Sequence, residues 1–408
     1  MDPMQAILDS IPDATRRVYL AYSGGLDSSV LLHLLLGEPR SYEILPWHVN
    51  HGLLEVAGEM EEFCARQARR LELELRIDRL QLSALDANVE AEARRQRYRL
   101  FAQQTGAGDC VVTAHHADDQ AETFLLNALR GSGVAGLRGI AQRRPLGEGL
   151  LIRPLLACSR AQLEAYAAEH EIAWFNDPSN QSLRYDRNFL RREIVPRLRH
   201  RWPGLVTALS TSSDIQAETQ LLLDEVAALD YHAVATESCG GIATLGLPGL
   251  LALSEPRRKN LLRHWATTAG FAAMPHARLE ELLQQLHARD DAQPNISMPG
   301  YSVRVYDQRL FLVADGEQPA IDGEFDFGQQ QLIEIEPLSL RLERHQIFER
   351  LGVDDRQQSL SLKFRRSGEP SRDRHRLKRL FQQHRVPPWQ RDRVAQVYLD
   401  GSLEGLLT

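Results

Sequence analysis

The first half of the chain alternates between short apolar runs and longer segments in which apolar residues recur every three or four positions. This pattern predicts strands followed by helices. The predicted strands cover residues 17–22, 42–49, 75–78 and 110–114, and the predicted helices cover 28–36, 55–71, 89–105, 117–129 and 159–170. Strands that alternate with helices indicate an α/β fold with a parallel sheet, in which ligands bind beyond the carboxyl ends of the strands.

The alternation stops after Trp202-Pro203, and the second half is organised differently. Residues 205–232 predict one long helix, followed by a glycine-rich break and two further helices at 255–269 and 275–287. Residues 302–313 alternate around Asp307-Gln308 as a hairpin does. We therefore expect three domains: an α/β domain at 1–204, a mainly helical domain at 205–320, and a small basic α+β domain at 321–408.

Bulk composition indicates a globular protein outside the membrane. The chain has 408 residues, of which 43% are hydrophobic and 25% are charged. No apolar run approaches the roughly 20 residues that a membrane span needs, and residues 1–17 lack a signal-peptide pattern. We expect a cytoplasmic protein without a membrane partner. The 4 cysteines are scattered without a Cys-x-x-Cys pair, which disfavours a zinc ribbon or a dithiol redox site.

Positive charge is concentrated although the net charge is −7. Residues 363–393 contain eleven Lys and Arg against three Asp and Glu, and residues 184–201 contain seven Arg against two acids. Segregated positive charge is typical of a surface that binds a polyanion, because phosphate contacts release counterions. A solvated surface remains the alternative for either run taken alone.

A phosphate-binding loop is the clearest chemical signal. Ser23-Gly24-Gly25-Leu26-Asp27-Ser28-Ser29 lies between a predicted strand and a predicted helix. The glycines allow close backbone approach, and the amides at a helix start attract phosphate. Asp27 would repel phosphate unless a cation lies between them, which predicts a Mg²⁺ ligand. The lysine of the Walker loop is absent. The loop therefore favours attack on the α-phosphate of ATP, with transfer of AMP.

Several ordered motifs carry a family resemblance. Ser23–Ser28 resembles the S-G-G-x-D-S loop of the N-type ATP pyrophosphatases. The segment His116-Ala117-Asp118-Asp119-Gln120-Ala121-Glu122-Thr123, followed by Arg130-Gly131-Ser132-Gly133, resembles a block of the tRNA(Ile)-lysidine synthetases. Further matching segments are 48–52, 90–98, 153–155, 177–180 and 187–191. The later chain is similar more loosely, at 377–380 and 386–389.

The resemblance implies a fold and a reaction. The fold would be an adenine-nucleotide alpha-hydrolase-like domain with a parallel sheet, followed by tRNA-binding domains. The reaction would join free lysine to C2 of the wobble cytidine of an isoleucine tRNA with a CAU anticodon. ATP would be consumed and Mg²⁺ would be required. Pyrophosphate and then AMP would be released, and the enzyme would be a ligase that forms a carbon–nitrogen bond. Nothing in the sequence indicates an obligate protein partner.

The motifs imply roles for individual residues. Candidate catalytic residues are Asp27, His116, Asp118 and Asp119. His116 would be a general base, and Asp27 and Asp118 would be metal ligands or would align the incoming amine. Candidate ATP-binding residues are Ser23, Gly24, Gly25, Leu26, Asp27, Ser28, Ser29 and His48. Candidate contacts to tRNA or lysine are Glu122, Arg94, Arg97, Arg130, Arg187, Asn188, Arg191, Lys378 and Arg379. Trp389 is either a platform for RNA bases or a buried aromatic anchor.

Two other functions stay open from the residues alone. A related tRNA-modifying adenylating enzyme, such as a thiolase, would share the loop, but it would need reactive or cluster-binding cysteines. A non-catalytic RNA-binding protein regulated by ATP would share the basic segments, but it would not need Asp27 or the acidic block at 116–122.

Overall fold

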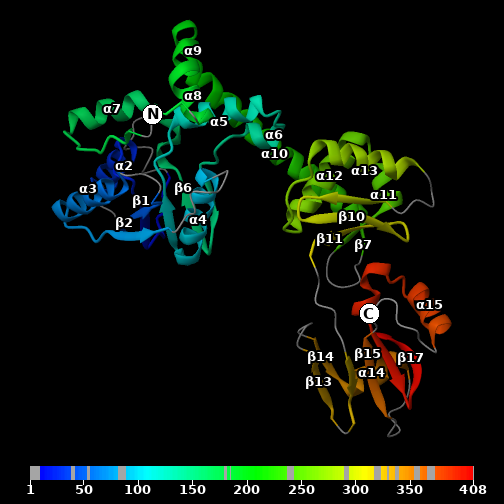
Figure 1. The fold of residues 1–408 in the computed structure, drawn as a ribbon. Helices are drawn as coiled ribbons and strands as arrows, with labels where there is room; N and C mark the ends of the chain where they lie inside the picture. Colours follow the sequence, from blue (N-terminus) through cyan, green and yellow to red (C-terminus); the bar gives the residue numbers. More distant parts are fainter. Residues whose placement is uncertain are drawn as a thin grey trace. The chain divides into compact units, whose positions relative to one another are not determined.

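The computed structural model describes residues 10–37, 42–52, 56–80, 89–178, 182–183, 185–236, 243–288, 294–316, 323–328, 330–335, 340–352, 359–364 and 373–407. The chain divides into two compact units, residues 1–222 and residues 223–408. Figure 1 shows the elements of both units. Within the described ranges, every helix is either too short or too polar to cross a lipid bilayer.

The first unit is built on a six-stranded sheet in the order β3-β2-β1-β4-β6-β5, in which only β5 runs antiparallel to its neighbour. Its strands are β1 (Arg17–Ala21), β2 (Glu43–Asn50), β3 (Arg76–Arg79), β4 (Asp109–Val112), β5 (Arg143–Leu146) and β6 (Gly149–Ile152). Its helices are α2 (Leu26–Leu36), α3 (Ala57–Arg70), α4 (Val89–Gln104), α5 (Ala117–Leu129), α6 (Val134–Leu137), η1 (Pro154–Ala157), α7 (Arg160–Glu169), α8 (Asp186–Phe189), η3 (Leu190–Ile194) and α9 (Val195–Arg201).

Alternating residues of β1 point into two apolar cores, one on each face of the sheet. Val18 and Leu20 are buried with α2 and α7 on one face. Tyr19 is buried on the other face with Trp47 of β2 and Phe101 of α4. A parallel sheet needs helices on both faces, because its strands are apolar on both sides. The expectation of an α/β domain with a parallel sheet is therefore confirmed.

Helix α10 (Leu205–Val234) runs from the first unit into the second. The second unit contains a five-stranded sheet in the order β7-β8-β11-β10-β9. Its strands are β7 (Ala235–Thr236), β8 (Thr244–Gly246), β9 (Asn295–Met298), β10 (Tyr301–Tyr306) and β11 (Arg309–Ala314), and its helices are α11 (Leu247–Ala252), α12 (Glu255–Thr268) and α13 (His276–Ala288). One apolar core joins the sheet to these helices. The hairpin β10–β11 turns at Asp307-Gln308 with positive φ at both residues, as predicted.

The end of the chain forms a second sheet in the order β12-β15-β16-β17 and a separate two-stranded sheet of β13 and β14. The elements are β12 (Gly323–Asp326), β13 (Leu332–Ile335), β14 (Leu340–Glu343), α14 (Arg344–Leu351), β15 (Leu360–Phe364), α15 (Arg374–Gln383), η5 (Pro388–Arg393), β16 (Ala395–Leu399) and β17 (Ser402–Leu407). Two further apolar cores lie here. The expected small α+β segment is present.

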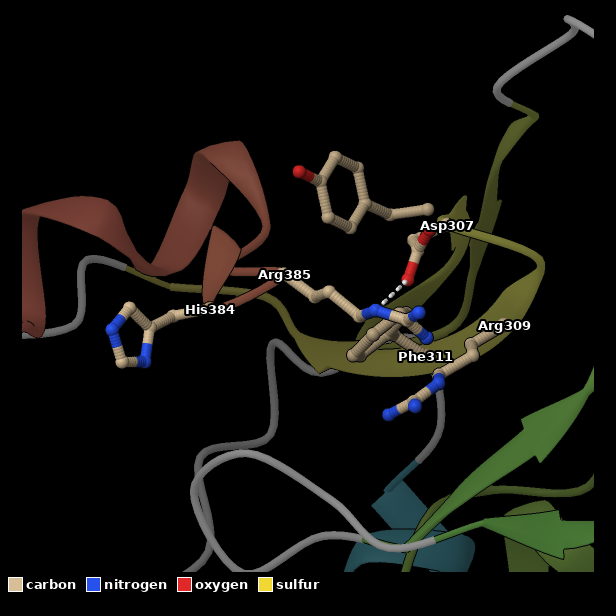
Figure 2. Close-up of a pocket in the computed structure, with 6 residues that line it drawn as sticks. Asp307, Arg309, Phe311, His384 and Arg385 are labelled. Atoms are coloured by element: carbon tan, nitrogen blue, oxygen red, sulfur yellow. Dashed lines mark ion pairs between the residues drawn. The ribbon is translucent and has the colours of Figure 1, made fainter. Parts of the chain in front are cut away.

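Trp389 of η5 packs against the hairpin β10–β11. Its ring centroid lies 5.5 Å from that of Phe311 and 6.2 Å from that of Tyr306, and the Arg304 guanidinium lies 5.1 Å from the indole. The sequence left two roles open for Trp389, and these contacts with protein side chains are those of an aromatic anchor. Next to it, a pocket of about 180 Å³ is lined by Tyr306, Asp307, Arg309, Phe311, His384 and Arg385. Figure 2 shows Arg385 reaching Asp307, with Nε 3.3 Å from Oδ2.

Most elements of the first unit lie within two or three residues of their predicted bounds, and α5 coincides with its prediction. The hairpin β5–β6 and the strands β7, β8 and β9 were not predicted. These strands are two to four residues long, which is too short for an alternating pattern to emerge from sequence.

Candidate active site

The phosphate loop follows β1 and leads into α2. Gly24 has φ +78°, and a Cβ at this position would lie 2.8 Å from the Cys64 sulfur and 3.1 Å from a ring carbon of Phe63. Only glycine fits this backbone and this space. The hydroxyl oxygens of Ser23 and Ser28 are 3.1 Å apart, and the Ser29 hydroxyl donates to the Gly24 carbonyl at 3.3 Å. The loop is thereby held open at the start of a helix, where amides attract phosphate.

Not every residue predicted in the loop can offer its side chain. Leu26 is buried in the apolar core beneath the loop, so it can contribute only its backbone. His48 is also buried, and its Nδ1 lies 3.0 Å from the Tyr22 carbonyl oxygen. Burial lowers the pKa of His48. A neutral His48 thus supports the strand end from which the loop departs.

His116 lies beside the loop because β1 and β4 are adjacent parallel strands. It precedes α5, and its backbone amide donates to the Asp119 carboxylate at 3.1 Å, a contact typical of a helix start. Its side chain is only 3% exposed. Nε2 lies 3.8 Å from Asp27 and 3.5 Å from Asp119, and Nδ1 lies 3.7 Å from Asp118. The structure therefore brings the four predicted catalytic residues together, with three carboxylates around the His116 imidazole.

Arg160 links two of these carboxylates. Its Nη1 donates to both Asp27 oxygens, at 2.9 and 2.7 Å, and its backbone amide donates to Asp118 at 2.7 Å. Burial raises the pKa of Asp27 above its ordinary value, and the charges of His116 and Arg160 offset only part of this rise. The second Asp118 oxygen accepts from Arg199. Arg160 and Arg199 thus supply counter-charges to the carboxylates predicted to hold a metal.

Sequence reasoning did not single out Arg160 or Arg199. A signal for Arg160 was present, because Ser159 and Gln162 form the capping box that starts α7. Arg160 therefore occupies the first position of a helix, where the helix dipole disfavours a cation. A residue placed against the dipole needs an anionic partner nearby, and Asp27 is that partner. Arg199 lies within the basic run 184–201 and had no comparable signal.

Asp119 and Glu122 are held by two arginines from a later helical segment. Arg187 contacts Asp119 at 3.0 Å and Glu122 at 2.9 Å, and Arg191 contacts the same two residues at 2.9 and 2.6 Å. Both arginines come from the continuous segment α8–η3–α9, which contains a π-helical turn at 190–194. Such turns occur frequently at functional sites. Burial alone would raise the pKa of Asp119, but His116, Arg187 and Arg191 lower it to about 2.

The other predicted contact residues are placed as follows. Arg94 and Arg97 lie on α4, where their guanidinium carbons are 5.1 and 5.8 Å from the Tyr98 ring. Arg130 follows α5 and lies 3.4 Å from Asp186, and the Asn188 side chain donates to the Ser182 carbonyl at 3.0 Å. Lys378 and Arg379 are exposed on α15 in the second unit.

Oxygen ligands are available for a hard cation. In the described part of the chain, no group of three or more His, Cys, Asp or Glu side chains has the spacing of a metal site. Magnesium is usually bound in enzymes through one or two carboxylates together with substrate phosphates and water. Asp27 lies in the phosphate loop itself and is 27% exposed, and Asp118 shares its Arg160 partner. This donor set fits Mg²⁺ held jointly with a nucleotide.

Comparison with known proteins places this site in a family. The family described as a PP-loop domain matches residues 3–198, a TilS substrate binding domain matches 245–311, and a TilS substrate C-terminal domain matches 354–404. The tRNA(Ile)-lysidine synthase of Serratia proteamaculans is 37% identical over 96% of this chain and 90% of the relative. The chain belongs to the tRNA(Ile)-lysidine synthase family.

Other members of the tRNA(Ile)-lysidine synthase family are similar to the same extent. The Coxiella burnetii protein is 35% identical over 94% of this chain and 87% of its own length. The Alkalilimnicola ehrlichii protein is 38% identical over 92% of this chain and 85% of its own length. The resemblance inferred from the motifs is confirmed. His116 and the three carboxylates around it lie within the segment that matches the PP-loop domain, as do Arg160, Arg187 and Arg191, whereas Arg199 lies one residue beyond its end.

The loop geometry predicts the effect of one methyl group. Gly24→Ala forces an L-residue into the left-handed region, which costs about 1–2 kcal/mol, and it also displaces Cys64 or Phe63. We expect lower stability in urea unfolding and a loss of ATP binding in calorimetry. Gly58→Ala is the matched control, because a Cβ at Gly58 meets nothing within 4 Å. Unchanged ATP affinity in Gly24→Ala would contradict the phosphate role of the loop.

The lowered pKa of Asp119 predicts a pH dependence of stability. Because its folded pKa is about 2 instead of the usual 3.8, the ionised group stabilises the fold above pH 4. This contribution, about 2 kcal/mol, is lost as the pH falls from 4 to 2. The difference in unfolding free energy between wild type and Asp119→Asn should shrink over that interval. Asp186→Asn, at an exposed acid, is the matched control. A constant difference for Asp119→Asn would disprove the assignment.

Proposed function

We propose that the chain joins free lysine to C2 of the wobble cytidine of an isoleucine tRNA with a CAU anticodon, using ATP and Mg²⁺. The supporting observation is the juxtaposition of a phosphate loop after β1 with the cluster of His116, Asp118 and Asp119 after β4. Membership of the tRNA(Ile)-lysidine synthase family supports the choice of base and amine.

The reaction consists of two displacements. The cytidine O2 attacks the α-phosphorus of ATP, the bond to the bridging oxygen breaks, and pyrophosphate leaves with the electron pair. The lysine amine then attacks C2, the C2–O bond breaks, and AMP leaves with that oxygen while the nitrogen loses protons. Neither displacement needs an enzyme nucleophile. Positioning and charge neutralisation provide the catalysis.

The loop and its neighbours carry the first displacement. Ser23, Gly24, Gly25, Ser28 and Ser29 bind the β- and γ-phosphates as the leaving group, so that the α-phosphorus faces the base. Asp27 and Asp118 would hold Mg²⁺, whose charge supplies neutralisation of the phosphates when it is bound. Arg160 contacts Asp27, and its positive charge opposes the rise in the pKa of Asp27 that burial causes, so this arginine orients the carboxylate and favours its ionised form.

His116 is the proton acceptor for the second displacement. Its Nδ1 is buried and has no hydrogen-bond partner among the described residues, so it is available to an incoming donor. Asp119 is a weak base because its pKa is about 2, and it orients His116 and the arginines instead. Glu122 is 3% exposed between Arg187 and Arg191. It attracts the lysine ammonium through the edge of this cluster.

The tRNA contacts extend along the chain. Five arginines and Asn188 of the first unit would contact the anticodon loop, whereas exposed basic residues of the second unit would contact other phosphates of the tRNA. The first group contains Arg94, Arg97, Arg130, Arg187, Asn188 and Arg191, and the second contains Lys378 and Arg379. We propose domain boundaries at 204 and 320, with catalysis in residues 1–204 and tRNA binding in residues 205–320 and 321–408.

Cysteine chemistry of the thiolase type finds no support in the residues that the structure describes. Cys64, Cys110 and Cys158 are all buried. Burial raises the pKa of Cys64 to about 12 and also raises the pKa of Cys110, so neither forms a thiolate at neutral pH. A buried thiol without a neighbouring thiol is a packing residue.

Pyrophosphate release measures the first displacement directly. Purified protein with ATP and Mg²⁺ should release pyrophosphate only when an isoleucine tRNA with a CAU anticodon is present. The same tRNA carrying uridine in place of the wobble cytidine is the matched control and should give no release. Release that is independent of tRNA would refute the proposed acceptor. No release with any tRNA would favour a non-catalytic RNA-binding protein.

Asp27→Asn tests the metal role. The variant keeps the size of the side chain but removes the charge that would hold Mg²⁺, so adding Mg²⁺ should no longer tighten ATP binding in calorimetry. Asp214→Asn, an exposed acid on α10, should keep the Mg²⁺ effect. The metal role of Asp27 is wrong if both variants respond to Mg²⁺ as wild type does.

A further inference from the structure

A cavity of about 400 Å³ opens beside α5 in the first unit, and its lining is dominated by arginine. Six arginines contribute to it: Arg94, Arg130, Arg138, Arg144, Arg153 and Arg187. None of the described residues that line the cavity is acidic. We call this cavity the arginine pocket. Four of its arginines belong to motifs already discussed, but Arg138 and Arg144 belong to none.

One helix forms both the wall of the arginine pocket and the acidic cluster. Thr123, Leu126, Asn127 and Arg130 line the pocket, and their spacing of three and four residues places them along one face of α5. Asp118, Asp119 and Glu122 precede them on the same helix. Thr123 donates to the Asp119 carbonyl at 2.7 Å, and Arg187 both lines the pocket and pairs with Glu122. A ligand in the pocket would therefore be separated from the carboxylates by a single side chain, that of Arg187.

The opposite wall is fixed to the same helix. The Gln120 side chain accepts from the Ile140 amide at 2.6 Å and donates to the Ile140 carbonyl at 3.3 Å. A Cβ at Gly139 would lie 2.5 Å from the Gln120 oxygen, so the 138–141 turn can approach only because residue 139 is glycine. Asn127 donates to the Gly136 carbonyl at 2.8 Å. The arginine pocket is thus a formed site with its shape set by hydrogen bonds.

Positive charge in the arginine pocket is only partly balanced, because Arg130 pairs with Asp186 and Arg187 pairs with Asp119 and Glu122. Within the described residues, no carboxylate pairs with Arg94, Arg138 or Arg144. Arg153 is 4% exposed, and its Nη1 donates to the Ala141 carbonyl, but its Nε has no hydrogen-bond partner among the described residues. Burial lowers the pKa of Arg153, and the charges of Arg144 and Arg94 lower it further. A buried guanidinium donor without an acceptor is costly, which indicates that an anion completes the site.

The neutral part of the lining identifies the class of anion. Leu126, Ile140 and Ala141 present apolar surface next to the guanidinium groups. A free pyrophosphate gains no favourable contact from apolar surface. A nucleotide, in contrast, places its phosphate on arginine and its base or sugar on apolar side chains. Arginine also matches phosphate oxygens through two parallel hydrogen bonds and stacks on bases.

We propose that the arginine pocket binds single-stranded RNA backbone, namely the phosphates of anticodon-loop nucleotides next to the cytidine that is modified. The proposal rests on the proposed function for the identity of the RNA. A neighbouring nucleotide held on one side of α5 would place the target base at the acidic cluster on the same helix. The other bases of the loop would then need no pockets of their own.

Neighbouring arginines on β5 provide the test. Arg144 lines the pocket, and Arg143, the preceding residue of β5, is exposed and does not line it. Consecutive strand residues point to opposite faces, so Arg144→Gln and Arg143→Gln remove the same charge from opposite sides. Binding of a labelled anticodon stem-loop RNA to the full chain would be measured by fluorescence anisotropy at several salt concentrations. Arg138→Gln, in the exposed turn, is the second pocket variant.

The expected result is a selective loss of RNA affinity. Arg144→Gln and Arg138→Gln should each weaken binding about tenfold, and each should reduce the slope of log affinity against log salt by about 0.7 for a lost phosphate contact. Arg143→Gln should bind as wild type does. ATP affinity and the unfolding midpoint should be equal in all four proteins, which excludes misfolding as the cause.

Two results would overturn the proposal. One is equal RNA affinity in the two pocket variants and Arg143→Gln. The other is a loss of affinity for inorganic pyrophosphate in the pocket variants with RNA affinity unchanged, which would make the pocket a product site. Failure of the proposed function is a different result, because it is measured on the wild-type protein. Wild-type protein that binds the stem-loop through this pocket but never forms lysidine would support the pocket and refute the reaction.

Discussion

Two carboxylates at the start of α5, Asp119 and Glu122, are buried between the guanidinium groups of Arg187 and Arg191. Removing one partner from a buried ion pair leaves the other uncompensated, at a cost of roughly 3–5 kcal/mol. The four side chains therefore hold the segment α8–η3–α9 against α5. Docking of that segment also brings Arg199 to Asp118. The geometry around His116 depends on this one set of ion pairs.

These ion pairs give the carboxylates of the cluster different roles. Asp119 and Glu122 are each held by two arginines and serve as fixed negative charges. Asp27 and Asp118 share Arg160, which reaches one through its side chain and the other through its backbone amide. A metal can replace the single guanidinium on Asp27 more readily than it can replace the two guanidiniums that hold the buried Glu122. Fixed charges that need no reorganisation are what a reaction without an enzyme nucleophile requires.

The sequence allowed the α/β fold, the phosphate loop and the identity of the acidic block to be predicted, because each depends on local patterns. Gly24 and Asp27 are recognisable from their neighbours alone, and α5 follows from periodicity. Contacts between distant residues were not predictable in the same way. That Arg160 would reach Asp27, 133 residues away, follows from the packing of α7 against α2 in one apolar core. The arginine pocket is similarly assembled from α4, α5, the 138–141 turn, β5 and Arg153, and no single segment contains its pattern.

The central claim is that the acidic cluster beside the phosphate loop delivers a lysine amine to an activated cytidine. Incubation with ATP, Mg²⁺, isotopically labelled lysine and an isoleucine tRNA with a CAU anticodon tests this most directly, with the product nucleoside identified by mass spectrometry. The account predicts label at the wobble position, with one AMP and one pyrophosphate formed per lysine. Transfer of label to another position, or AMP formation without label in the tRNA, would contradict it.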